Sequence, residues 1–106
     1  MTKSELNIWI AKQRGFYPND NGRLYTSATG ETHHFSDLPN VCGDDHLSVD
    51  FRHAMVEQFH SISIMAYSGM RQCTVIAHDG KAYAYESDSE AYAVAMAIYK
   101  AVEGKE

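Results

Sequence analysis

The second half of the chain constrains the fold most, because five regular segments follow one another from Leu47 to Glu103 with almost no loop between them. A helical pattern comes first and another comes last. Between them, alternating apolar and polar residues predict three strands: Ser61 to Tyr67, Gln72 to His78 and Lys81 to Glu86. Asp79-Gly80 predicts a two-residue hairpin turn that takes positive φ at both positions.

Each helix of this half is expected to bury one stripe of side chains. In the first helix the stripe recurs at helical spacing: Leu47, Phe51, Ala54, Met55, Gln58 and Phe59. The last helix is expected to start with the capping box of Ser87-Asp88-Ser89-Glu90 and to end at Gly104. Its stripe consists of small and branched residues that let the helix approach the sheet closely: Ala91, Val94, Ala95, Ile98 and Val102.

The N-terminal part predicts one helix and one hairpin. Thr2 and Glu5 form a capping box, and Gly15 is expected in the left-handed region where this helix ends. Two short segments, Arg23 to Thr26 and Thr32 to Phe35, predict a β-hairpin. The resulting order is α-β-β-α-β-β-β-α, an α+β sandwich in which an antiparallel sheet packs against helices.

Length and hydropathy indicate one globular domain. A chain of 106 residues has room for one core, so we expect residues 1–106 to form a single domain. No apolar run approaches the ~20 residues that span a bilayer, and the first residues lack an apolar signal region. We therefore expect a cytoplasmic protein that has no membrane partner.

The formal net charge of −5 argues against direct nucleic-acid binding, which depends on a basic surface. Acidic residues gather where a loop leads into the helix near Leu47, and we expect them to lie on one exposed side and to bind a partner: Asp44, Asp45, Asp50 and Glu57. An acidic surface suits docking on a basic protein, and it also suits solubility.

Short motifs over most of the chain carry a resemblance: Leu6-Asn7-Ile8-Trp9-Ile10-Ala11, Gly15-Phe16, Leu38-Pro39, Asp44-Asp45 and the alanine-rich segment from Ala91 to Val102. In these motifs the chain resembles the phage ABA sandwich domain family, small phage and prophage proteins that are mostly uncharacterised. The resemblance implies a phage origin and a fold. The chain departs from the family where Val41-Cys42-Gly43 replaces an aromatic residue and a serine or threonine, and where Cys73 replaces a strand tryptophan.

The order helix, three strands, helix is also that of a double-stranded RNA-binding domain. That module grips phosphates with lysines at the start of its final helix. The chain has Asp88 and Glu90 there, and these carboxylates would repel phosphates. RNA binding is therefore not expected.

Histidines and carboxylates alternate along the helix near Leu47: His46, Asp50, His53, Glu57 and His60. Such spacing can supply two ligands of a zinc site. The chain has no H-E-x-x-H motif and no pair of C-x-x-C motifs. We interpret the stripe as a solvated helix face and predict neither a metal nor a cofactor.

Catalysis is not expected either. Cys42 and Cys73 are predicted to be free thiols. Cys42 stands close to His46, but the neighbouring Asp44 and Asp45 disfavour the thiolate that a nucleophile requires. No pair of carboxylates has a spacing that indicates acid–base chemistry, so the chain is predicted not to be an enzyme.

Two functions agree with these observations. The first is a non-catalytic phage or prophage accessory protein that binds and inhibits a host protein, in particular a component of bacterial immunity such as a CRISPR effector, by blocking a basic nucleic-acid groove with its acidic surface. The alternative is an oligomeric sponge that sequesters a small nucleotide signal. Unmatched basic side chains in a pocket would favour the sponge, and the candidates are Arg23, Arg52 and Arg71. A homodimer is compatible with both functions.

Overall fold

A computed structural model describes residues 1–104 of the chain. The fold is α+β with antiparallel sheets, which confirms the predicted fold class. The chain divides into two compact units, of which the first is Met1–Asn40 and the second begins at Val41. Each unit contains one three-stranded sheet. The single domain over residues 1–106 stays a prediction.

The helix of the first unit, α1 (Lys3–Gln13), begins and ends as its sequence predicts. The Thr2 hydroxyl accepts a hydrogen bond from the Glu5 amide at 3.1 Å, and the Glu5 carboxylate accepts one from the Thr2 amide at 3.2 Å. At the other end, Gly15 has φ of +91°. The Phe16 amide donates to the Ala11 carbonyl there at 3.0 Å, the bond that closes a Schellman motif.

The sheet of the first unit has the order β1-β2-β3. Its strands are β1 (Tyr17–Asn19), β2 (Leu24–Thr26) and β3 (Thr32–His34), with short 3₁₀ turns at Asp20–Gly22 and Phe35–Asp37. The β2–β3 hairpin was expected, whereas β1 was not, because Pro18 interrupts the pattern. Proline is tolerated in β1 because this strand lies at the edge of the sheet, where one side needs no donor. A small core of Ala11, Tyr25 and Leu38 holds this unit together.

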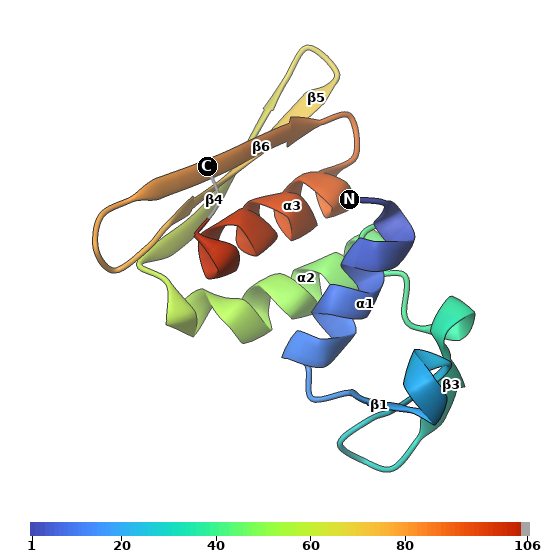
Figure 1. Ribbon diagram of the computed structural model, residues 1–106. Helices are drawn as coiled ribbons and strands as arrows, with labels where there is room; N and C mark the ends of the chain where they lie inside the picture. The colour runs from blue at the N-terminus through green and yellow to red at the C-terminus, as the bar shows by residue number, and fades with distance from the viewer. Residues whose placement is uncertain (105–106) are drawn as a thin grey trace. The chain divides into compact units, whose positions relative to one another are not determined.

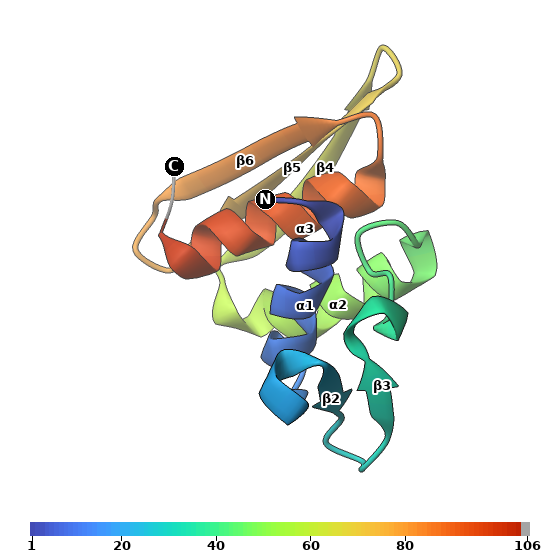
Figure 2. The ribbon, with the colours of Figure 1, turned by 45° about the vertical axis from the view of Figure 1, so that its right-hand side comes forward.

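The second unit contains the elements predicted from its sequence. They are α2 (Asp45–Met55) with a 3₁₀ turn at Val56–Gln58, β4 (Ser61–Tyr67), β5 (Met70–Ile76), β6 (Ala82–Ser87) and α3 (Glu90–Glu103). The sheet has the order β4-β5-β6 with antiparallel pairing throughout. Helix α3 packs on β5 and β6, and α2 packs on α3 (Figures 1 and 2).

The two hairpin turns of this sheet differ in length. Ser68 and Gly69 have φ of +45° and +79° and form the two-residue turn between β4 and β5. Between β5 and β6, the Ala77 amide donates to the Lys81 carbonyl at 2.9 Å, so the loop has three residues and only Gly80 takes positive φ. The predicted two-residue turn at Asp79-Gly80 was therefore wrong.

One face of the sheet carries the core. Cross-strand pairing aligns Val75 with Ile62 and Tyr83, and it aligns Cys73 with Ile64 and Tyr85. Cys73 and Val75 are fully buried, and Tyr83 is buried as well. Tyr83 thus belongs to the core face on which α3 packs.

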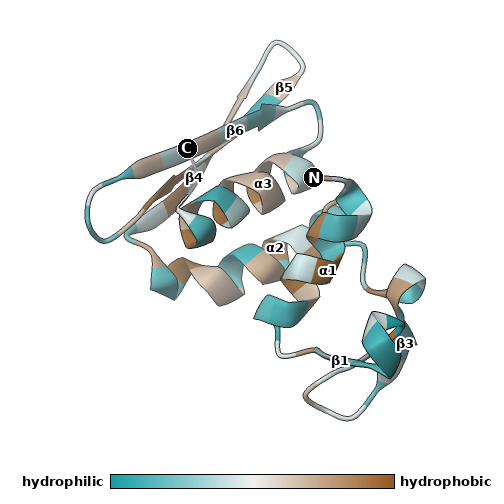
Figure 3. Cartoon of the chain, in the orientation of Figure 1, coloured by the Kyte–Doolittle hydropathy of each residue, from teal (hydrophilic) through white to brown (hydrophobic). Residues whose placement is uncertain are grey.

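Helix α3 buries more of its circumference than one stripe. Ala93 and Ala97 are buried in addition to the predicted alanines, because α3 contacts the sheet on one side and α2 on another. Val102 was expected in the stripe but is exposed, so that prediction was wrong. Figure 3 shows the largely apolar character of this helix. No helix within residues 1–104 combines the length and hydrophobicity needed to cross a bilayer.

Helix α2 is rotated relative to the stripe expected from its sequence. Phe51, Met55 and Phe59 are buried as predicted. Ser48 takes the fourth buried place instead of Leu47, while Ala54 and Gln58 are exposed. The apolar residues alone did not fix the rotation, because the buried side of α2 is set by the elements that it packs against.

This rotation predicts a contrast between two positions of α2. Replacing Phe51 with alanine should lower the free energy of unfolding by roughly 3–5 kcal/mol, because the side chain is fully buried. Ala54→Gln should change it by less than about 0.5 kcal/mol, because the site is exposed. Urea unfolding measures both values. A large loss for Ala54→Gln would contradict the rotation.

Candidate functional site

The net negative charge of the chain comes entirely from the second unit. From Val41 onward the sequence has ten acidic and five basic side chains, whereas residues 1–40 have four of each. The net charge of −5 therefore belongs to the second unit, where the predicted partner-binding residues lie. The candidate functional site is the solvent-facing part of α2 and of the turns at its two ends.

All four predicted binding residues are exposed: Asp44, Asp45, Asp50 and Glu57. Asp45 and Asp50 lie on α2, and Glu57 lies on the 3₁₀ turn that follows. Asp50 follows Asp45 by five positions, which turns their side chains about 140° apart around the helix axis. The carboxylates thus spread over the solvent side of α2 and do not form one line.

The carboxylates of this surface are not engaged inside the molecule, with one exception. Within residues 1–104, the side chains of Asp45, Asp50 and Glu57 form no hydrogen bond and no ion pair. Their charge is therefore not compensated by a neighbouring cation. Each remains free to meet a basic group of a partner.

The exception is Asp44, which is the N-cap of α2. Its carboxylate accepts hydrogen bonds from the amides of His46 at 2.9 Å and Leu47 at 3.2 Å. This role was missed, although an aspartate directly before a helical pattern is a typical N-cap signal. Asp44 therefore stabilises the helix that presents the other carboxylates.

The predicted histidine stripe is exposed but does not continue along one helix. His46, His53 and His60 are all exposed, but only His46 and His53 lie on α2, because the helix ends at Met55 and His60 directly precedes β4. The prediction that one helix carries all three was wrong. In the part of the chain that the structure describes, no three His, Cys, Asp or Glu side chains converge as metal ligands would.

Cys42 and Cys73 form no disulfide, and both side chains are fully buried. Burial raises the pKa of Cys73 to about 12. The charge of Arg52 acts in the opposite direction, and the smaller effect of Glu90 acts in the same direction as burial. The Cys73 thiol is therefore neutral at physiological pH. A buried neutral thiol is a packing group and not an accessible nucleophile.

The three arginines considered for a nucleotide pocket differ in their surroundings. Arg71 lies 4.0 Å from the Glu90 carboxylate and donates to the Met70 carbonyl at 3.1 Å, so it is matched. Arg52 lies half-buried on α2, and Arg23 is exposed in the first unit. A depression of about 430 Å³ in the first unit contains none of the three, and its lining is Lys3, Ser4, Asn7, Phe35, Ser36, Leu38 and Asn40.

Comparisons of the chain with protein-family models, with curated proteins and with solved structures gave no match. The resemblance to the phage ABA sandwich domain family therefore stays a prediction that rests on the motifs quoted above. The site has to be interpreted from its own geometry.

The N-cap role of Asp44 predicts different effects of two substitutions. Asp44→Ala should lower the free energy of unfolding by about 1 kcal/mol, because the amides of His46 and Leu47 lose their acceptor. Asp44→Asn should cost only a few tenths of a kcal/mol, because its side-chain oxygen still accepts. Urea unfolding of both variants measures the difference, and equal losses would contradict the N-cap role.

The raised pKa of Cys73 predicts a pH dependence. The thiol of an unfolded chain has a pKa of about 8.5, so the stability gained by keeping Cys73 buried and neutral is complete below that pH. It declines as pH rises toward about 12, by at most roughly 1.4 kcal/mol per pH unit. The difference in unfolding free energy between the native chain and Cys73→Ala, measured under reducing conditions, should therefore shrink from pH 8 to 10. A constant difference would contradict this.

Proposed function

We propose that this chain is a non-catalytic phage or prophage accessory protein that binds a host protein through the exposed carboxylates of α2. The observation that carries the proposal is the free state of Asp45, Asp50 and Glu57 within a unit that holds all of the chain's net charge.

Electrostatics explains how such a surface acts. Charges of one sign on one side of a protein accelerate encounter with a surface of opposite sign and fix the orientation of the two partners. Since the three carboxylates have no internal cation to release, binding a basic partner breaks no ion pair of this chain.

The host protein that fits this surface has a basic groove. Proteins that bind nucleic acids line their grooves with lysine and arginine side chains that contact phosphates. Carboxylates displayed on a helix can occupy the same side chains and exclude the nucleic acid. We therefore propose a component of bacterial immunity, such as a CRISPR effector, as the target, and the phage origin rests on the family resemblance.

The state of the two thiols supports a non-catalytic role. Cys42 and Cys73 are the strongest nucleophiles by residue type, and neither is accessible to a substrate. Binding at α2 involves no covalent step.

Neutralising the surface without removing its hydrogen bonds tests the proposal. The variant replaces four carboxylates by amides: Asp44→Asn, Asp45→Asn, Asp50→Asn and Glu57→Gln. A matched control makes the same change of charge elsewhere: Glu31→Gln, Asp37→Asn, Asp79→Asn and Asp88→Asn. Each chain is expressed in cells whose CRISPR system targets an infecting phage, and the efficiency of plaque formation is measured.

The native chain and the control should restore plaque formation, and the α2 variant should not, with all three proteins melting at similar temperatures. Equal activity of the α2 variant and the native chain would contradict a role for these carboxylates. Failure of the native chain against every CRISPR type would contradict the proposed target. A rise in melting temperature with a cyclic nucleotide would favour the sponge.

A further inference from the structure

The sheet of the second unit has two edges that differ in how they are protected. Proteins normally shield an edge strand with charged side chains, proline, a bulge or a covering element, because its unpaired backbone groups attract another strand. No strand within residues 1–104 pairs with the outer side of β4. Its sequence, Ser61 to Tyr67, has neither a charged residue nor a proline.

The edge at β6 has such protection. Lys100 of α3 donates to the carbonyl of Ala84 at 3.5 Å and lies 5.3 Å from the centre of the Tyr85 ring. Lys81 precedes the strand, and Glu86 lies within it. The contrast shows that β4 is the open edge of this sheet.

Charge also singles out β4 for self-association. A chain with a net charge of −5 repels a second copy wherever acidic residues meet. The stretch from Gln58 to Met70 is the longest in the chain without Asp, Glu, Lys or Arg, and it contains all of β4. Two copies can therefore approach along β4 with no like charges in contact.

The backbone of β4 presents alternate residues outward. Tyr67 and Met70 flank the two-residue turn and form a hydrogen-bonded pair, so Met65 and Ser63 also bond to β5. The intervening residues, Ile62, Ile64 and Ala66, direct their backbone groups away from β5. These are the groups that a further strand would bind.

These outward residues are self-complementary. We consider a second β4 that lies antiparallel to the first, with Ile64 on the two-fold axis. Ile64 then faces Ile64 of the other copy, and Ile62 of each copy faces Ala66 of the other, which makes three pairs. All three pairs are then hydrogen-bonded pairs of an antiparallel ladder. A shift by one residue would misalign every bond and would turn the apolar face toward water.

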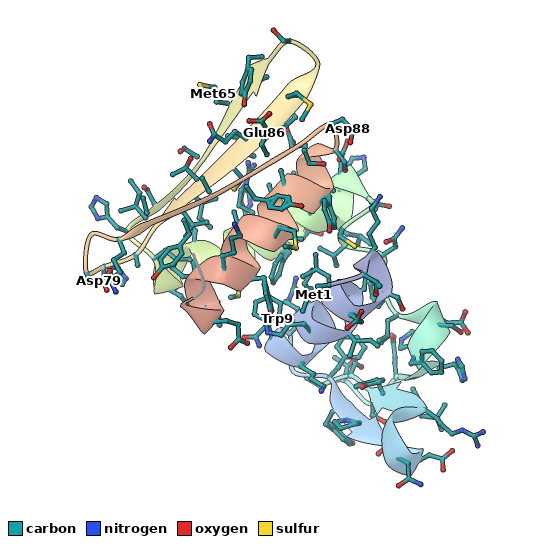
Figure 4. All side chains as sticks on the ribbon, turned by 45° about the horizontal axis from the view of Figure 1, so that its top comes forward. Met1, Trp9, Met65, Asp79, Glu86 and Asp88 are labelled. Atoms are coloured by element: carbon teal, nitrogen blue, oxygen red, sulfur yellow. The ribbon has the colours of Figure 1, made fainter. Side chains whose placement is uncertain are left out.

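The side chains gain from the same pairing. Ile62 and Ile64 belong to the core face of the sheet but are only half-buried, because α3 lies over β5 and β6. A second copy would place its own Ile62, Ile64 and Ala66 beside them and extend the core face across both sheets. Met65 lies on the opposite face, where Figure 4 shows it pointing away from α3, and it is 56% exposed.

We propose that two copies of this chain pair through β4 to form a symmetric dimer with one continuous six-stranded sheet. The interface is isologous, as expected for a two-fold dimer. It includes none of the α2 carboxylates, so it goes beyond the proposed function and does not depend on it.

Two matched substitutions test the dimer. Ala66→Lys puts a long charged side chain on the open edge, and Ala84→Lys makes the same change at an exposed alanine of the other edge strand. Ile64→Pro removes an outward amide that the monomer does not use. Sedimentation equilibrium at about 100 μM and at tenfold lower concentrations measures the mass, because dimerisation follows mass action.

The native chain and Ala84→Lys should sediment at twice 11.9 kDa at the highest concentration and dissociate on dilution. Ala66→Lys and Ile64→Pro should remain monomeric, and circular dichroism should show that they are folded. A monomeric native chain, or equal dimerisation of both lysine variants, would overturn the proposal.

Amide hydrogen exchange provides a test that needs no substitution. The amides of Ser63, Met65 and Tyr67 should exchange slowly at any concentration, because they bond to β5. The amides of Ile62, Ile64 and Ala66 should become slow only at concentrations at which the dimer forms. Fast exchange of these three amides in the dimer would show that another surface forms it and would overturn the β4 pairing.

Discussion

The second unit depends on the close packing of α3 against the sheet. Ala93, Ala97 and the neighbouring buried residues of α3 are small, so the helix lies near Cys73 and Val75. The same helix supports α2 on another side. Helix α3 covers the core face of β5 and β6, so β4 is left at the edge of the covered area. The same helix contacts one side of α2 and leaves the opposite side exposed to solvent. Both proposed interaction surfaces follow from this arrangement.

Local signals predicted much of the fold. The capping box at Thr2 and Glu5, the glycine at position 15 and the bounds of β4 all follow from the chemistry of a few neighbouring residues. The errors arose where the structure of a segment depends on elements that are distant in the sequence. Ala54 and Val102 were placed in buried stripes by spacing alone, but which side of a helix is buried depends on the elements that it meets. β1 was not predicted because Pro18 argues against a central strand, and the sequence does not show which strand will lie at the edge of the sheet.

The candidate site was likewise predicted only in part from the sequence. Residue type was enough to predict that Asp45, Asp50 and Glu57 would be exposed. It did not separate them from Asp44, whose carboxylate stabilises the start of α2, because the helix had been expected to begin two residues later. The concentration of all net charge in the second unit became evident only when the structure divided the chain at Val41.

The most direct test of the central claim, that the α2 carboxylates recognise a basic host protein, is the salt dependence of association with that protein. Surface charges act through a field that ions screen, with a Debye length of about 10 Å at 0.1 M salt and about 3 Å at 1 M. The association rate constant measured by surface plasmon resonance should therefore fall steeply between these concentrations, while the dissociation rate changes much less. An association rate that is the same at both concentrations would contradict the claim.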